Sequence, residues 1–287
     1  MQQWRFRPDQ GKDRIVSGAK QDGDNATRFS GRVDDYVKAR PSYPEGVLAV
    51  LRSECGLGPS SVVCDLGSGT GIFTKLLLES GATVHAVEPN DEMRAAAEAM
   101  LGAIPAFQSV AARAEATGLP DASVDLVTAA QAFHWFDVER ARSEMRRIVR
   151  VRADKDASAD ARDTSCNVAL VWNDRELDAT PFLRVYEELL VRRFPKYREL
   201  QGKADSIDKF DALLGAGQWN RHTVPNEQRL DREGLVGRLL SSSYAPRPGD
   251  PSHEETLAEL RALFDRYAED GEIALLYTTV VIAGRAG

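Results

Sequence analysis

A glycine-rich loop after the first strongly apolar segment constrains the fold of this chain more than any other stretch. The loop is CDLGSGTG, residues 64–71, and it lies between the apolar segment 62–66 and the helix-like segment 72–80. Glycines allow backbone conformations that other residues avoid, and they leave room for a ligand where a Cβ would clash. A strand, a glycine turn and a helix in this order therefore predict a nucleotide-binding edge of an α/β sheet.

The rest of the chain continues this alternation of strands and helices. Apolar strand-like segments alternate with helix-like segments, which predicts a mostly parallel sheet covered by helices on both faces. The expected strands are 62–66, 83–87, 106–110, 124–129, 167–172, 222–230 and 273–283, and the expected helices between them include 72–80, 91–101 and 138–149. The charged segment 152–165 breaks the pattern and is typical of a surface loop.

Length and composition set the scale of the fold. The chain has 287 residues, of which 43% are hydrophobic, and this suits one large α/β domain with insertions or two modest domains. No apolar run approaches the roughly 20 residues that a membrane-spanning helix needs. The polar start MQQWRFRPDQGKDRIV lacks the apolar stretch of a signal peptide. We therefore expect a cytoplasmic protein without a membrane partner.

Charge and cysteine usage narrow the partners further. The net charge of −7 gives little support to a nucleic-acid partner, because such proteins carry a basic surface. The three cysteines, Cys55, Cys64 and Cys166, lie far apart without the spacing of metal ligands. We therefore expect no metal site, and reduced thiols as is usual in the cytoplasm.

The spacing of the glycines distinguishes between nucleotide ligands. Dinucleotide enzymes use G-x-G-x-x-G to hold a pyrophosphate, but this chain has Ile72 where the third glycine of that motif would stand. The actual third glycine, Gly71, comes one residue early. This shift disfavours a nicotinamide dehydrogenase.

Two acids flank the loop and suggest what it binds. Glu88 ends the next expected strand, about 20 residues after the first glycine, where an acid accepts hydrogen bonds from ribose hydroxyls. Asp65 lies at the end of the first strand, where a carboxylate suits a cationic group better than a pyrophosphate. The ligand is thus expected to contain a nucleoside and a positive charge.

Together, Asp65 to Gly71 and the pair Glu88-Pro89 resemble the class I S-adenosylmethionine-dependent methyltransferases. Further segments resemble the small-molecule branch that includes trans-aconitate methyltransferases, with a methyltransferase type 11 domain, and extend the likeness over nearly all of 29–285. They are FSGRVDDYVKARPSYP (29–44), ARAEATGLPDASVDLVTAAQAFHWFD (112–137), LLSSSYAP (239–246) and LLYTTVVIAGR (275–285).

The resemblance implies a fold and a cofactor site. The fold would be a Rossmann-like seven-stranded sheet of order 3-2-1-4-5-7-6 with the last strand antiparallel, in a single domain 1–287 with an N-terminal cover 1–45 and a lid insertion 174–217. S-adenosylmethionine, with S-adenosylhomocysteine as product, would be held by the loop, by the acid of the second strand and the helix after it, and by residues that follow the third and fourth strands. Tyr36 and Arg40 of the N-terminal segment would close over its carboxylate, with a surface ion pair as the alternative for Arg40. The residues of the cofactor site are Tyr36, Arg40, Asp65, Gly67, Ser68, Gly69, Thr70, Gly71, Glu88, Pro89, Met93, Ala114, Glu115, Gln131 and Ala132.

Methyl transfer requires alignment of an acceptor with the methyl group, and neither a metal nor a catalytic triad. His134 follows the apolar fourth strand, and its ordinary pKa of about 6.5 suits a general base for a hydroxyl acceptor. Phe133, Trp135 and Tyr244 are expected to contact the substrate. The alternative is that His134 and Trp135 only form the wall of the pocket.

The function expected from the sequence is methyl transfer to a small-molecule acceptor, at a carboxylate or hydroxyl oxygen, by a monomer or homodimer. Two alternatives remain at this stage. Asp65 and Glu88 serve binding, so a non-catalytic S-adenosylmethionine-binding protein would also carry them. A methyltransferase that acts on a macromolecule is the other alternative, although the acidic charge argues against a nucleic-acid substrate.

Overall fold

A seven-stranded sheet forms the centre of the computed structural model, which describes residues 40–150, 166–195, 197, 207–242 and 244–286. The strand order is β3-β2-β1-β4-β5-β7-β6. β1 to β5 run parallel, and β7 runs antiparallel to both β5 and β6. The expected sheet order is therefore confirmed. The strands are β1 (Val62–Leu66), β2 (Thr83–Val87), β3 (Phe107–Val110), β4 (Leu126–Ala130), β5 (Val168–Arg175), β6 (Trp219–Leu230) and β7 (Ile273–Gly284).

Four of the helices begin at a residue whose side chain caps the first turn. The Asn90 side chain accepts a hydrogen bond from the Met93 N–H, and Asp137, Thr180 and Asp231 cap three later helices in the same way. The helices are α2 (Gly46–Cys55), α3 (Ile72–Glu79), α4 (Asp91–Leu101), the 3₁₀ turn η1 (Phe133–Trp135), α5 (Val138–Ile148), α6 (Pro181–Arg193), α8 (Ile207–Leu214), α9 (Arg232–Leu240) and α10 (His253–Tyr267).

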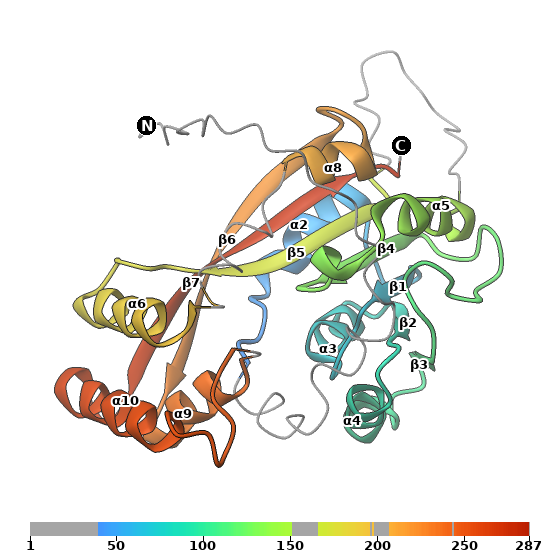
Figure 1. Cartoon of the computed structure of the whole chain (residues 1–287). Coiled ribbons are helices and arrows are strands. Elements are labelled where there is room, and N and C mark those ends of the chain that lie inside the picture. Colours follow the sequence, from blue (N-terminus) through green and yellow to red (C-terminus); the bar gives the residue numbers. More distant parts are fainter. Residues whose placement is uncertain (1–39, 151–165, 196, 198–206, 243, 287) are drawn as a thin grey trace, which may run out of the picture.

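Both faces of the sheet are covered (Figure 1). On one face, α2 and α3 bury Leu51 and Phe73 against a cluster that includes Val281. On the other face, α5 and α8 bury Met145 and other side chains against a cluster that includes Ile282. Neighbouring residues of β7 thus serve opposite faces, as the pleat of a strand requires.

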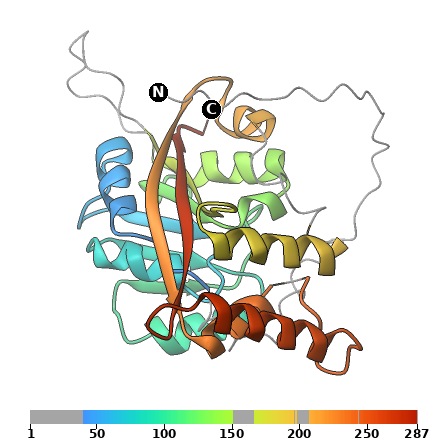
Figure 2. The same cartoon turned by 90° about the vertical axis from the view of Figure 1, so that its left-hand side faces the viewer.

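The antiparallel pair of β6 and β7, which is connected through α9 and α10 and which we call the hairpin, extends beyond the short strands and carries a separate group of helices. Figures 1 and 2 show α6, α9 and α10 gathered at the far end of this hairpin, away from β1 to β3. We call this region the helical end. Its apolar cluster includes Phe182 of α6, Leu239 of α9, Leu260 of α10 and Tyr277 of β7. The hairpin therefore joins two cores in one molecule.

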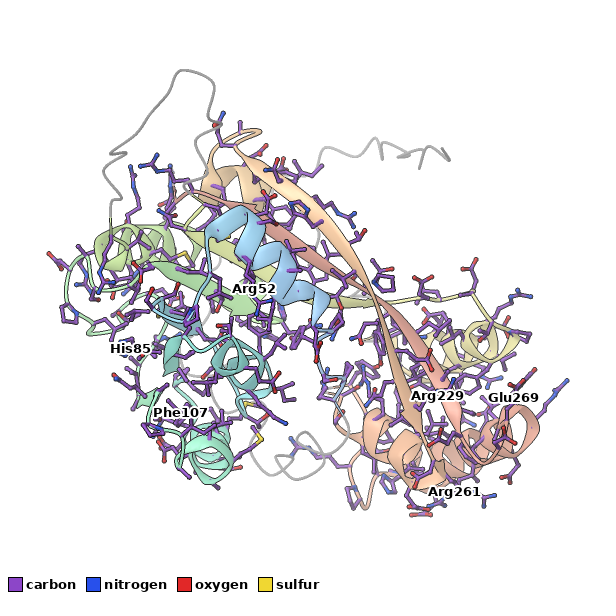
Figure 3. All side chains as sticks on the ribbon, turned by 180° about the vertical axis from the view of Figure 1, so that it is seen from behind. Arg52, His85, Phe107, Arg229, Arg261 and Glu269 are labelled. Carbon is purple, nitrogen blue, oxygen red and sulfur yellow. A yellow bond between two sulfur atoms is a disulfide. The ribbon has the colours of Figure 1, made fainter. Side chains whose placement is uncertain are left out.

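The view from behind shows the same separation (Figure 3). Arg229, Arg261 and Glu269 lie at the helical end, across the molecule from His85 of β2 and Phe107 of β3.

Within the described ranges, every helix is too short or too polar to cross a lipid bilayer.

The insertion 174–217 contributes helices to two different places. α6 packs against α10 at the helical end. α8 packs against α5 on the sheet, where Phe210 stacks on Trp172 and Phe133 with ring centroids 5.5 and 6.2 Å apart. The role of the insertion as a lid stays a prediction. The charged segment 152–165 lies outside the described residues.

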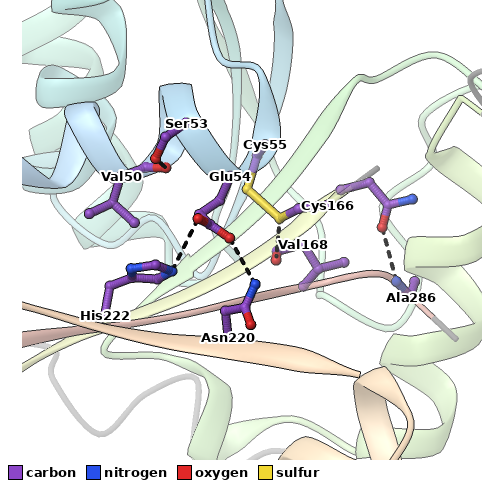
Figure 4. The surroundings of a disulfide bond; sticks show 10 residues. Val50, Ser53, Glu54, Cys55, Cys166, Val168, Asn220, His222 and Ala286 are labelled. Carbon is purple, nitrogen blue, oxygen red and sulfur yellow. Dashed lines mark hydrogen bonds and ion pairs between the residues drawn. A yellow bond between two sulfur atoms is a disulfide. The ribbon is translucent and has the colours of Figure 1, made fainter. Parts of the chain in front are cut away.

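A disulfide ties the end of α2 to the start of β5 (Figure 4). Cys55 and Cys166 are paired across 111 positions of sequence, with their Cα atoms 4.5 Å apart. The expectation of three reduced thiols is therefore wrong for these two, because the fold places them side by side; Cys64 is free and buried in β1. Beside the disulfide, Glu54 accepts a hydrogen bond from Asn220 at 2.9 Å.

Candidate functional site

The loop after β1 turns tightly at its first glycine. The backbone N–H groups of Gly67 and Ser68 both donate to the carbonyl oxygen of Val87, at 2.8 and 3.1 Å. Gly67 has a φ of 66°, and a Cβ added there would lie 2.6 Å from the Cβ of Ala132. Only glycine lets the loop pass this close to the end of β4.

The other two glycines of the loop serve different purposes. Gly69 has a φ of 57°, and the nearest atom to an added Cβ is Met93 Sδ at 3.9 Å, so its backbone faces open space. At Gly71, with a φ of 83°, an added Cβ would lie 2.8 Å from Leu101 Cδ1. The bare backbone of Gly71 therefore lets α3 approach α4, whereas Gly69 leaves room for a ligand.

Asp65 is the buried acid of the site. Its side chain is fully buried, and its two oxygens accept hydrogen bonds from Thr74 Oγ1 at 2.7 Å and Thr128 Oγ1 at 2.9 Å. Burial raises the pKa of Asp65 to about 6, while these two hydrogen bonds act in the opposite direction. Each carboxylate oxygen has a second lone pair, so Asp65 can still accept from a ligand.

Glu88 lies against the loop just beyond β2. Its Oε2 accepts from the Gly69 N–H at 2.9 Å, and its Oε1 accepts from the Asn90 N–H at 2.8 Å. Burial raises the pKa of Glu88, and the hydrogen bonds and the nearby Arg94 oppose that shift. The carboxylate is thereby fixed in one orientation at the mouth of the loop.

Two adjoining cavities open at the carboxyl ends of the strands, on either side of this loop. The cofactor-side cavity has an empty volume of about 840 Å³ and contains most of the predicted cofactor residues. Its lining is Gly67, Gly69, Glu88, Pro89, Asn90, Met93, Arg113, Ala114, Glu115, Ala130, Gln131, Ala132, Trp135 and Phe136. Trp135, which was expected to contact the substrate, thus lines the same cavity as Glu88.

The second cavity has an empty volume of about 580 Å³ and shares Gly67, Gly69, Ala130 and Gln131 with the first. We call it the acceptor-side cavity. Its remaining lining comes from the segment before α2, the end of β1, the loop, the start of α3, β5, α9 and β7. These residues are Arg40, Pro41, Tyr43, Asp65, Ser68, Thr70, Ile72, Phe73, Asn173, Arg238 and Tyr277.

Sequence reasoning missed the contribution of α9 and β7 to this cavity. Arg238 lies three residues after the buried Leu235 and next to the buried Leu239, so a charged residue stands on the buried side of a helix. Tyr277 continues the buried alternation of Ile273 and Leu275 in β7. A charged or phenolic side chain on the buried side of an element was the sequence signal that could have indicated this contribution to the cavity.

Some predicted site residues lie elsewhere. His134 lies in η1 with its ring 4.5 Å from the Trp135 ring, and it is not part of the described lining of either cavity. Phe133 is buried in the core beside Phe210. Tyr244 packs at the helical end, 5.1 Å from the ring of Tyr197. Tyr36 lies outside the described residues.

Gln131 occupies an unusual backbone conformation between the two cavities. Its φ is 57°, in the left-handed region that residues other than glycine seldom adopt. Its N–H donates to the Val171 carbonyl at 2.8 Å, and this bond holds the conformation. Backbone strain of this kind concentrates at ligand sites, and Gln131 lines both cavities.

The polar atoms of the loop fit the expected cofactor. Ser68 Oγ and Thr70 Oγ1 are buried and have no hydrogen-bond partner in the described part of the chain. Buried polar atoms are normally satisfied, so these two hydroxyls suit a polar ligand in the acceptor-side cavity. Asp65 suits an ammonium group, and Glu88 beside the other cavity suits ribose hydroxyls. S-adenosylmethionine carries both groups.

Comparisons with known proteins agree with this geometry. A sequence profile described as a methyltransferase domain matches residues 64–153. An uncharacterized methyltransferase-like protein of Schizosaccharomyces pombe is 33% identical over 262 residues, which cover 89% of this chain and 94% of the relative. An uncharacterized methyltransferase of Mycobacterium tuberculosis is 29% identical over 262 residues, which cover 90% and 96%.

A solved structure shows the same architecture over most of the chain. An assumed type II methyltransferase from Anaeromyxobacter dehalogenans is similar with a TM-score of 0.60 and 25% identity, covering 86% of this chain and 98% of that one. The full-length relatives, the sheet order and the acid–glycine loop all point to one family. The chain belongs to the class I S-adenosylmethionine-dependent methyltransferases.

Proposed function

We propose that the chain transfers a methyl group from S-adenosylmethionine to a small-molecule acceptor, at a carboxylate or hydroxyl oxygen. The observation that carries the proposal is the adjacency of the two cavities, which share Gly67, Gly69, Ala130 and Gln131. A donor that extends from Glu88 past the loop to Asp65 would leave space beside it in the acceptor-side cavity. The resemblance to the trans-aconitate branch favours a small organic acid among the acceptors.

The chemistry needs little from the protein beyond positioning. The donor supplies a methyl group that its sulfonium already activates: an acceptor oxygen forms a bond to the methyl carbon as the carbon–sulfur bond breaks, and the electron pair stays on sulfur. The walls of the two cavities orient the acceptor and exclude water. Alignment of this kind accounts for about 7–11 kcal/mol of a barrier in model reactions.

A hydroxyl acceptor must also lose a proton, and His134 stays the predicted base. Its place in η1, directly after β4, brings it near the carboxyl ends of the strands. We expect His134→Ala to slow turnover by about tenfold or more while binding of S-adenosylhomocysteine is unchanged. Unaltered turnover across the pH range would contradict the assignment and leave His134 as part of the wall.

The proposed function also includes the binding partners of the protein and its cellular compartment. A net charge of −7 favours a small-molecule acceptor without nucleic-acid or membrane partners, acting as a monomer or homodimer. A cytoplasmic location is part of the proposal. The Cys55–Cys166 disulfide removes the argument from free thiols, because structural disulfides are rare in that compartment.

A screen for transfer of a tritiated methyl group tests the function directly. The panel would hold small acids, phenols and amines, and calorimetry with S-adenosylhomocysteine would run beside it. We expect saturable binding and transfer to at least one acid or phenol, with no binding of NADH. Binding without transfer to any acceptor would favour a non-catalytic binding protein, and absence of binding would overturn the proposal.

A further inference from the structure

Arg238 reaches from α9 into the acceptor-side cavity, on the side formed by the helical end. Its Nε donates to the hydroxyl of Tyr277 at 3.3 Å, and its Nη1 donates to Ser242 Oγ at 3.2 Å. Both partners are neutral hydroxyls. These two contacts hold the guanidinium in place without neutralising its charge.

In the part of the chain that the structure describes, Arg238 has no anionic partner. No carboxylate forms an ion pair with Arg238 among the described residues, and its Nη2 has no acceptor there. Burial raises the pKa of the neighbouring Tyr186, so this phenol stays neutral. Arg175, the other arginine near this phenol, pairs with Glu187. A permanently charged guanidinium in such surroundings suits an anionic ligand.

The charges of the cavity can be matched against the donor. The lining contains one carboxylate, Asp65, and two guanidinium groups, Arg40 and Arg238. The methionine end of S-adenosylmethionine carries one ammonium and one carboxylate, so it uses the acid and one of the two arginines. One guanidinium is left for the acceptor.

Position decides which arginine is left. Arg40 belongs to the segment before α2, which packs on the sheet beside α3, the helix that follows the glycine loop, and its Nη2 already donates to the carbonyl oxygen of Ser241 at the end of α9, at 3.0 Å. Arg238 belongs to α9 in the helical end, so it approaches from the part of the molecule that the loop does not form (Figure 1). Arg40 is therefore assigned to the donor and Arg238 to the acceptor.

We propose that the acceptor carries a carboxylate that Arg238 binds, and that the methylated oxygen belongs to a different group of the same molecule. The inference rests on the proposed function and names its substrate class. A carboxylate held by a guanidinium is a poorer nucleophile, because its charge is shared with the donor N–H groups. The anchored group thus fixes the acceptor while a second hydroxyl or carboxylate oxygen faces the methyl group.

The test uses binding, so it does not depend on knowing the acceptor. Calorimetry would first measure S-adenosylhomocysteine, and then benzoate, succinate and citrate against protein saturated with it. Benzamide and succinamide are neutral probes of the same shape. We expect saturable binding of at least one carboxylate probe below about 10 mM, with the matching amide weaker by about tenfold or more.

Substitutions in α9 test whether Arg238 is the residue that binds the carboxylate probe. Arg238→Gln should weaken the carboxylate probe by about tenfold and leave the affinity for S-adenosylhomocysteine within about twofold, which also shows that the variant is folded. The affinity of Arg238→Lys for the carboxylate probe should lie between the affinities of the wild type and of Arg238→Gln. Arg232→Gln is the matched control, because Arg232 is an exposed residue of α9 that pairs with Asp265; it should change neither affinity.

Three results would overturn the inference. They are loss of S-adenosylhomocysteine affinity in Arg238→Gln with the probe unchanged, equal binding of acid and amide probes, and absence of any carboxylate binding to the loaded protein. In the first case Arg238 would hold the donor. Failure of the wild-type protein to bind S-adenosylhomocysteine would instead contradict the proposed function, so the two failures are distinguishable.

Discussion

The two halves of the sheet are built differently, and under the proposed function they would hold the donor and the acceptor respectively. Strands β1 to β4 have four or five residues each, and the loops at their ends place Asp65 and Glu88. Strands β6 and β7 have 12 residues each, and Tyr277 and Arg238 enter the site from β7 and from α9.

The difference between the two halves of the sheet matches the extent of the similarity to the methyltransferase domain profile. The methyltransferase domain profile matches 64–153, which begins within β1, contains β2 to β4 and ends before β5. The proposed donor site therefore lies on the part that the profile matches, and much of the proposed acceptor side lies on the hairpin and its helices. Experiments that change one half and spare the other test this division.

The largest effect is expected where the two halves are joined. The Cys55–Cys166 disulfide closes a loop of 111 positions, and a loop of about this length stabilises the folded state by about 4–5 kcal/mol through the unfolded chain. Cys55→Ser with Cys166→Ser should therefore lower the free energy of unfolding in urea by about that amount. Dithiothreitol should destabilise the wild type to the same extent.

The double variant is also the control for that experiment. Dithiothreitol should not change its stability, because no disulfide remains. A wild-type protein that shows three reactive thiols in denaturant before any reduction would contradict the disulfide, whereas one thiol, that of Cys64, is expected.

Asp65 should give the next largest effect, confined to the donor half. Its pKa is raised from 3.8 to about 6, so the folded state binds the proton more tightly than the unfolded chain. This group therefore removes stability as the pH rises from about 4 to about 6, by about 3 kcal/mol in total. Asp65→Asn should stabilise the ligand-free protein at pH 7 by up to that amount, measured by urea unfolding.

Binding should respond to the same substitution in the opposite direction. Without the carboxylate, affinity for S-adenosylhomocysteine should fall, and the decline in wild-type affinity below about pH 6 should disappear. The stability difference between the two proteins should vanish below about pH 3, where Asp65 is protonated in both the folded and the unfolded state. A stability difference that does not change with pH would contradict the raised pKa.

Glu88→Ala tests the cofactor-side cavity. The substitution removes the acceptor of the Gly69 and Asn90 N–H groups and the expected ribose contact, so affinity for S-adenosylhomocysteine should fall by at least about tenfold, or about 1.4 kcal/mol. Glu79→Ala, at an exposed position of α3, should leave calorimetric affinity unchanged. Wild-type affinity in Glu88→Ala would exclude this carboxylate from the donor site.

The features of β1 to β4 and of the loops that follow them could be predicted from the sequence, because each is encoded in a short stretch of consecutive residues. The apolar strand segments gave the sheet order through the family resemblance, and Asp137 and Thr180, residue types that favour the first position of a helix, do cap helices. The glycine loop and Glu88 meet at one cavity because both follow neighbouring parallel strands. Each of these features depends on a few consecutive residues and on the rule that parallel strands end at one edge.

The features that could not be predicted depend on how segments far apart in the sequence pack against one another. Cys55 and Cys166 pair only because α2 lies over the start of β5. Arg238 reaches the cavity only because α9 packs at the far end of a long hairpin. Gly71 belongs to the same motif as Gly69, yet it faces Leu101 of α4. Neither periodicity nor spacing contains these contacts.

The smallest predicted effect separates the two halves most sharply. Tyr277→Phe removes only the hydroxyl that accepts from Arg238 Nε and lies 3.4 Å from Gln228 Oε1. Losing one hydrogen bond of this kind costs about 1 kcal/mol, so a carboxylate probe should bind about fivefold more weakly to the loaded variant. Affinity for S-adenosylhomocysteine should stay at the wild-type value, the reverse of Glu88→Ala. If Tyr277→Phe weakens both ligands equally, the hydroxyl acts on the whole site and the acceptor side is not an independent half.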